Sequence, residues 1–217
     1  MSEPSLIKVP TEVQGRVLLE KKESSSPQHL VLALHGYGES SEHMISRLRP
    51  WVNEDLALAC VEALHPIYLP NRKIGHSWMT SHLREEAIID NLKYIERTLV
   101  ELRQHLSFRT LTVLGYSQGA QMAMRVVRWL EGDHLIAIGG ELPPELLEPP
   151  LWGTERLPKS AFLAKGKKDL HLPSVVLNKN LEQWTSWGCP CSSIELPGAH
   201  RWLDTWANDL EEAKPPH

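Results

Sequence analysis

The sequence has few cysteines, no long apolar run and no excess of basic residues. Its three cysteines form an odd number, and Cys189 and Cys191 lack a second pair or a nearby histidine, so we expect reduced structural thiols and no metal site. No window reaches the roughly 18 apolar residues of a membrane span. The N-terminus also lacks a basic start followed by an apolar stretch, so a cytoplasmic protein is expected. The net charge of -4, with scattered lysine and arginine, disfavours nucleic acid or anionic lipid and favours a small, uncharged or mildly polar substrate.

Short apolar runs alternate with amphipathic stretches along the 217 residues. Runs this short and apolar on both faces are typical of buried parallel strands, and they cover 30–35, 56–61, 111–115, 135–140, 161–166 and 192–197. Apolar residues at three- and four-residue steps predict a long helix over 83–106 and shorter ones over 42–53, 118–130, 174–187 and 202–212. The alternation predicts a single α/β domain over 1–217, with its core at about 15–210 and helices on both faces of a mostly parallel sheet. We also expect an antiparallel strand pair across 13–34 and a disordered tail at 213–217.

Ser117 lies in the sequence GYSQG, a GxSxG motif over 115–119. An apolar strand directly precedes the motif, and a helical stretch rich in small residues directly follows it. A serine in such a sharp turn needs small residues two positions away on each side, because the chain doubles back on itself. The placement between strand and helix makes Ser117 the candidate nucleophile.

A serine hydroxyl becomes nucleophilic at neutral pH only with an imidazole to take its proton and a carboxylate to orient that imidazole. In open parallel sheets, sites form beyond the carboxyl ends of the strands. Asp169 and His200 each follow a predicted strand, whereas Asp133 and His134 precede one and so lie at the opposite edge. We therefore predict a triad of Ser117, Asp169 and His200, in the chain order that a nucleophile of this type uses.

Hydrolysis through a tetrahedral intermediate also needs hydrogen-bond donors for an oxyanion. The backbone N–H of Gln118, directly after the nucleophile, is one candidate. The other is the N–H of Tyr37, in the glycine-rich loop HGYG that follows the strand 30–35. His35 in this loop is expected to have a supporting, hydrogen-bonded role rather than to act as a second base. The same loop reads as GxGxxS, but a dinucleotide fingerprint would need a third glycine.

Several motifs together resemble the phospholipase/carboxylesterase family of α/β-hydrolases, which includes small carboxylesterases and acyl-protein thioesterases. The similar segments span about 15–210 and are HGYG, HSW, GYSQG, GGELP, GKKDLHLP and PGAH. The resemblance implies an α/β-hydrolase fold and cleavage of carboxylic esters or thioesters through an acyl-serine intermediate, without a cofactor. It implies the same triad and the same two backbone donors. Tyr37 and Glu39 depart from the leucine and aspartate that acyl-protein thioesterases usually have.

The substrate side of the site is less well defined by the sequence. No insertion between 140 and 160 is long enough for a sizeable lid, so we expect an open site that favours short or medium acyl groups. Trp78, Trp152 and Trp202 are candidates to line the acyl pocket, since aromatic walls suit an apolar chain. A noncatalytic binding module with this fold, and an acyltransferase or amidase with the same triad, are the alternatives. Either a monomer or a homodimer is compatible with the sequence.

Overall fold

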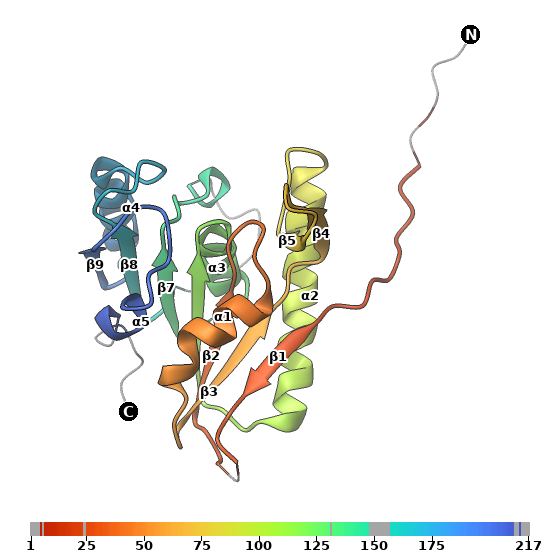
Figure 1. Ribbon diagram of the computed structural model, residues 1–217, viewed down its shortest axis with the longest axis horizontal. Coiled ribbons are helices and arrows are strands. Elements are labelled where there is room, and N and C mark those ends of the chain that lie inside the picture. Colours follow the sequence, from red (N-terminus) through yellow and green to blue (C-terminus); the bar gives the residue numbers. More distant parts are fainter. Residues whose placement is uncertain are drawn as a thin grey trace.

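The protein is built around a central sheet of mostly parallel strands (Figure 1). A computed structural model describes residues 5, 7–23, 25–130, 132–147, 157–210 and 213. In this part of the chain the sheet has seven strands in the order β1-β3-β2-β6-β7-β8-β9. Only the β1–β3 pair is antiparallel. The strands are β1 (Val17–Glu20), β2 (His29–Leu34), β3 (Leu56–Val61), β6 (Thr110–Tyr116), β7 (His134–Ile138), β8 (Ser160–Gly166) and β9 (Cys191–Leu196).

All six predicted strands are present, and the parallel α/β arrangement is confirmed. β9 was predicted to be buried, but it is an edge strand and mostly partly buried or exposed. The central strands are apolar on both faces because helices cover both faces of the sheet. In β2, for example, the residues from Leu30 to Leu34 are all fully buried.

The predicted antiparallel pairing across 13–34 is wrong. β1 pairs with β3, with Val17 opposite Val61, and β2 lies between β3 and β6. β2 is buried on both faces and takes parallel neighbours on both sides, whereas the half-exposed β1 occupies the outer edge beyond β3. Adjacency along the chain therefore does not give adjacency in this sheet.

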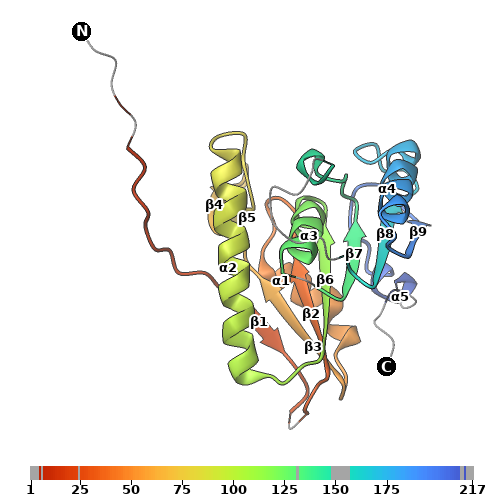
Figure 2. The same cartoon turned by 180° about the vertical axis from the view of Figure 1, so that it is seen from behind.

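Two groups of helices cover the two faces of the sheet (Figures 1 and 2). One face packs against α2 (Arg84–His105), α3 (Gln118–Trp129) and α4 (Ser174–Ser186). The other packs against α1 (Ser41–Leu48), the short 3-10 helix η1 (Arg49–Trp51) and α5 (Trp206–Asp209). The predicted helix over 202–212 is thus reduced to the single turn of α5 within the described residues. No helix in the described ranges is both long and apolar enough to cross a lipid bilayer.

A short hairpin that the sequence analysis missed lies beside the loop after β2. Its strands are β4 (His65–Tyr68) and β5 (Ile74–Ser77), which pair antiparallel outside the main sheet. The hairpin is joined to that loop by two backbone hydrogen bonds, from Gly38 N–H to His76 O at 2.9 Å and from His76 N–H to Glu39 O at 3.0 Å. It therefore supports the HGYG segment from the side.

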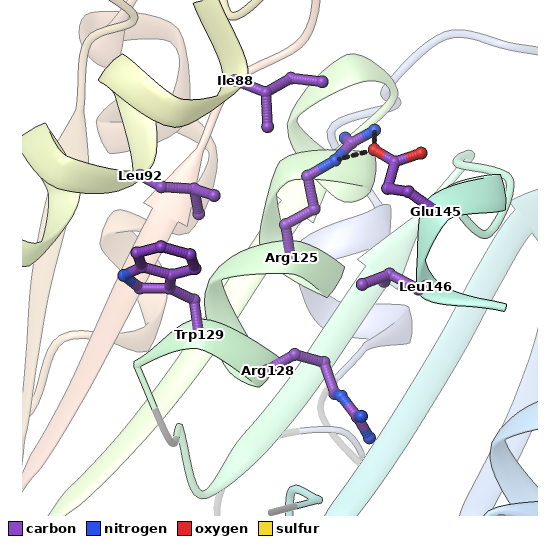
Figure 3. Close-up of a pocket in the computed structure, with 7 residues that line it drawn as sticks. All are labelled: Ile88, Leu92, Arg125, Arg128, Trp129, Glu145 and Leu146. Atoms are coloured by element: carbon purple, nitrogen blue, oxygen red, sulfur yellow. Dashed lines mark hydrogen bonds and ion pairs between the residues drawn. The ribbon is translucent and has the colours of Figure 1, made fainter. Parts of the chain in front are cut away.

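The segment after β7 is held against α3 by an ion pair (Figure 3). Glu145, in the 3-10 helix η2 (Pro144–Leu146), accepts hydrogen bonds from Nε and Nη2 of Arg125. The Arg125 side chain is only 3% exposed, and Ile88, Leu92 and Trp129 line the small apolar pocket beside it. A buried guanidinium is costly unless it is paired, so the ion pair fixes where the segment after β7 lies.

Candidate active site

Ser117 occupies a strained turn between β6 and α3. Its backbone has φ 53° and ψ -117°, a conformation that a residue with a side chain adopts at a cost of about 1–3 kcal/mol. A Cβ added at Gly115 would lie 2.1 Å from Gly119 O, and one added at Gly119 would lie 2.2 Å from Leu34 O. Only glycine fits at these two positions, which explains the GxSxG pattern. The turn leaves the Ser117 hydroxyl at the carboxyl edge of the sheet.

The three predicted triad side chains form a continuous hydrogen-bonded chain. Ser117 Oγ lies 2.7 Å from Nε2 of His200, and Nδ1 of the same ring lies 2.7 Å from Oδ2 of Asp169. The residues follow three different strands, β6, β8 and β9, which all end at the same edge of the sheet. A carboxylate can only accept, so the His200 proton resides on Nδ1 and Nε2 is free to accept the proton of Ser117.

Asp169 is held in one orientation by the loop that carries it. Its side chain is 1% exposed. The oxygen that does not face His200, Oδ1, accepts the backbone N–H groups of His171 at 2.8 Å and Leu172 at 3.1 Å. These donors stabilise the buried charge and leave Oδ2 aimed at the imidazole.

The His200 ring is packed between neighbours but reaches solvent. Its side chain is 22% exposed. The Tyr116 ring stacks on it, with centroids 5.8 Å apart and an angle of 24° between the planes. The ring of His171 lies 4.8 Å away, and a Cβ at Gly139 would lie only 3.2 Å from Cε1 of His200. These contacts restrict the imidazole to the plane that joins Ser117 and Asp169.

The two predicted oxyanion donors have no acceptor among the described residues. Neither the N–H of Tyr37 nor that of Gln118, the first residue of α3, donates a hydrogen bond within those ranges. The Gly36 carbonyl accepts from Nδ1 of His35 at 2.7 Å and from Glu39 N–H at 3.2 Å. Because the C=O and N–H of a trans peptide point in opposite directions, these bonds turn the Tyr37 N–H away from His35.

His35 is neutral under ordinary conditions because burial lowers its pKa to about 4. The side chain is fully buried, and its Nε2 accepts the backbone N–H of Ala63 at 3.1 Å. The ring therefore donates through Nδ1 and accepts through Nε2, as the supporting role expected of it requires.

The Gln118 side chain ties the turn at Ser117 to the end of the β4–β5 hairpin. Its Oε1 accepts Trp78 N–H at 2.9 Å and the Ser77 hydroxyl at 3.2 Å, and its Nε2 donates to Met79 O at 2.7 Å. Trp78 is fully buried, and its indole N–H donates to His35 O at 2.8 Å. Trp78 therefore does not line the open cleft at Ser117, where the sequence analysis expected it, but supports the HGYG loop.

An open cleft of about 550 Å³ lies in front of Ser117 and His200. Trp202 is among the residues that line it, with 6% of its surface exposed. Trp152, the third candidate for an acyl-pocket wall, lies outside the described residues. Residues 148–156 of the segment between 140 and 160, in which no sizeable lid was expected, also lie outside them. The described lining is mostly polar and comprises Gly36, Tyr37, Glu39, His43, Ser46, Arg47, Tyr116, Ser117, His200, Arg201, Trp202 and Asp204.

Sequence reasoning missed two charged residues of the cleft and the aromatic ring that packs with them. Arg47 of α1 forms two hydrogen bonds with Glu39, and its guanidinium lies near the ring of Tyr116. In the sequence, Glu39 stood out only as a departure from the family pattern and Tyr116 only as part of the GYSQG motif, and nothing marked Arg47. No group of side chains in the described part of the chain could hold a metal ion.

Comparisons with known proteins find relatives by structure only. No family model and no curated protein matches the chain. Esterase PE8 superposes with a TM-score of 0.73 at 22% identity over 92% of this chain and 99% of that one. The carboxylesterase of Bacillus cereus has a TM-score of 0.69 at 18% identity over 92% of each chain. Acyl-protein thioesterase 2 of Zea mays has 0.67 at 15% identity, over 92% of this chain and 99% of its own. Together with the mostly parallel sheet, these similarities show that the protein has the α/β-hydrolase fold.

Proposed function

We propose that the protein is a serine hydrolase of the phospholipase/carboxylesterase family that cleaves carboxylic esters or thioesters of short to medium acyl groups. The observation that carries the proposal is the hydrogen-bonded chain from Ser117 through His200 to Asp169. The N–H groups of Tyr37 and Gln118, which have no acceptor in the described part of the chain, support it as oxyanion donors. Three proteins of similar structure also support the proposal, because their names describe them as an esterase, a carboxylesterase and an acyl-protein thioesterase.

The reaction follows from the arrangement of these groups. His200 Nε2 takes the proton of Ser117 as Oγ attacks the acyl carbon, and the carbonyl oxygen becomes an oxyanion facing the N–H groups of Tyr37 and Gln118. The C–O or C–S bond then breaks, and His200 returns the proton to the leaving alcohol or thiol. Water, deprotonated by the same imidazole, then attacks the acyl carbon. The bond from that carbon to Ser117 Oγ breaks, His200 returns the proton to Oγ, and the carboxylic acid leaves. Asp169 stays ionised throughout and stabilises the imidazolium.

The open, mostly polar cleft supports an acyl group of limited length. A long apolar chain would gain little from a lining of charged and hydroxyl groups. Turnover of p-nitrophenyl esters from acetate to palmitate tests this directly, and we expect kcat/KM to fall beyond medium chain lengths. A rise up to palmitate would contradict the length preference without affecting the chemistry.

The chemistry is tested by labelling the protein with a fluorophosphonate and locating the adduct by mass spectrometry. We expect one adduct on Ser117 and none in Ser117→Ala, which should keep its fold and lose ester turnover. Ser160 provides a matched control, because its hydroxyl lies 2.8 Å from Nδ1 of His134 at the opposite edge of the sheet. Ser160→Ala should label and turn over like the wild type.

The outcomes also separate the alternative functions. A folded protein that neither labels nor turns over would favour the noncatalytic binding module. Labelling at Ser117 with acyl transfer to added alcohols or amines in preference to water would favour an acyltransferase. Retained turnover in Ser117→Ala would refute the proposed mechanism.

A further inference from the structure

An ion pair lies in the cleft beside Ser117 and has no part in the mechanism above. Arg47 Nη1 donates to Oε2 of Glu39 at 2.8 Å, and Nη2 donates to Oε1 at 2.7 Å. The two side chains are only 18% and 19% exposed. A bidentate pair with this geometry and burial is more strongly held than an exposed pair of single contacts.

One end of the pair contacts the loop that carries the first oxyanion donor. Glu39 Oε2, the oxygen that accepts Nη1 of Arg47, also accepts the backbone N–H of Gly36 at 3.0 Å. The main chain of Glu39 closes the same turn, because its N–H donates to Gly36 O at 3.2 Å. Both ends of the Gly36 residue are thus bonded to Glu39, and the next N–H along the chain is that of Tyr37.

The other end of the pair contacts the aromatic rings that support His200. The Arg47 Cζ lies 5.3 Å from the centroid of the Tyr116 ring and 5.2 Å from that of Trp202. These two rings meet edge to face at 5.6 Å. Tyr116 in turn stacks on the His200 ring. A guanidinium held against aromatic faces favours a fixed position of both partners.

We propose that Glu39 and Arg47 are positioning residues that join the oxyanion loop to the rings supporting His200. They hold the Tyr37 N–H and the His200 imidazole in a fixed position relative to each other. The inference rests on the proposed function, since it concerns the same site. The pair touches Gly36 on one side and Tyr116 on the other, and it bridges two elements that are otherwise separate in the chain, the loop after β2 and the end of β6.

The electrostatics of Glu39 explain why the pair acts as a unit. Burial pushes the pKa of this carboxyl up, but the hydrogen bonds and charge of Arg47 outweigh it and hold the pKa below its usual value. Without Arg47, the carboxylate would be a part-buried charge with no cation. It would protonate or turn toward water, and either change weakens its bond to Gly36 N–H.

The test uses Arg47→Met and Glu39→Gln, with Arg49→Met as the matched control. Arg49 forms a similar two-bonded pair with Glu20, at 2.7 and 3.0 Å, but its side chain is 63% exposed and neither residue lines the cleft. We expect Arg47→Met to lower kcat by about 10- to 100-fold with KM changed less than about threefold, since a displaced oxyanion donor acts on the transition state. Arg49→Met should leave both constants unchanged.

Two further measurements distinguish positioning from simple structural support. The affinity for a boronic acid, which mimics the tetrahedral intermediate, should fall by the same factor as kcat. Both quantities are measured under conditions in which circular dichroism shows each variant to be folded. The double variant should lose no more than Arg47→Met alone, because the two residues act as one unit. Arg47→Lys should recover only part of the activity, because an ammonium does not present the two-pronged geometry.

Several results would overturn the inference. One is an unchanged kcat in folded Arg47→Met. Another is a double variant whose loss of kcat equals the product of the two single losses. A third is a raised KM limited to anionic esters, which would make Arg47 a substrate-binding residue. Failure of the proposed function is distinguishable, because it would appear as turnover retained in Ser117→Ala, or as a folded wild-type protein without ester turnover.

Discussion

Replacing Asp169 by asparagine should leave the site intact in shape and reverse the hydrogen bond to His200. The loop sets the orientation of the new amide, because the N–H groups of His171 and Leu172 both point at Oδ1 and need an acceptor there. The amide oxygen must therefore take the Oδ1 position, and the amide nitrogen must face Nδ1 of His200. That nitrogen donates, so Nδ1 has to accept and the imidazole proton moves to Nε2. Nε2 then donates toward Ser117 and cannot take its proton.

The expected loss is about 10⁴-fold in kcat, as found when this aspartate-to-asparagine change is made in a serine protease triad. This corresponds to about 5.5 kcal/mol of barrier. KM should change little, because no group that faces the substrate has moved. Steady-state turnover of p-nitrophenyl butyrate by the purified protein gives both kcat and KM.

Asp133 supplies the control for this change. It also accepts a backbone N–H, from Leu111 at 2.9 Å, and pairs with Lys159 at 2.8 Å, but it lies at the opposite edge of the sheet. Asp133→Asn alters the charge of the protein equally and should keep wild-type kcat in the folded state. If Asp169→Asn kept more than about a tenth of the wild-type kcat, His200 would not depend on that carboxylate and the reasoning would fail.

Two further predictions concern stability. Alanine at Gly119 would place its Cβ 2.2 Å from Leu34 O, so the free energy of unfolding in urea should fall by about 3 kcal/mol. Gly188, with φ 91° and nothing within 4 Å of its added Cβ, should lose only about 1–2 kcal/mol, and equal losses would contradict the steric argument. The pKa of His35 is lowered from 6.5 to about 4, so between these pH values the unfolded chain binds a proton that the folded protein does not. The free energy of unfolding should therefore fall by roughly 3 kcal/mol as the pH falls from about 6.5 to about 4. His35→Gln should flatten this part of the urea-derived stability profile, whereas an unchanged slope would assign it to other groups.

The strands of the main sheet could be predicted because a strand buried on both faces leaves an apolar run in the sequence. The run 56–61 coincides with β3, and the others differ from their strands by a residue or two. The β4–β5 hairpin left no such run, because β4 alternates between partly buried and exposed residues and the buried residues of β5 are Gly75 and Ser77. The place of β1 beyond β3 could not be read either, since pairing depends on which edges remain open once the parallel strands have assembled.

The triad could be predicted because it follows from topology. Strands that run parallel end at one edge, so residues directly after β6, β8 and β9 must lie near one another whatever the loops do. Arg47 and Tyr116 follow from no such rule. Arg47 belongs to a helix whose sequence pattern shows only which face is buried, and its contact with the cleft depends on how α1 packs against β1, β2 and β3. The burial of Trp78 likewise depends on the hairpin that the sequence did not reveal.

Ser117 and Ser160 each lie within hydrogen-bond distance of a histidine, and comparing these two pairs shows what a hydrogen bond alone does not supply. Ser117 lies 2.7 Å from His200, and Ser160 lies 2.8 Å from His134. Ser160 begins β8, with no helix N-terminus behind it, and burial lowers the pKa of His134, which weakens this imidazole as a base. Ser117 directly precedes α3, whose first residue, Gln118, has a backbone N–H with no acceptor among the described residues, and its histidine is backed by a buried carboxylate. Reactivity therefore depends on the edge of the sheet at which the pair lies, and a fluorophosphonate should modify Ser117 while leaving Ser160 untouched.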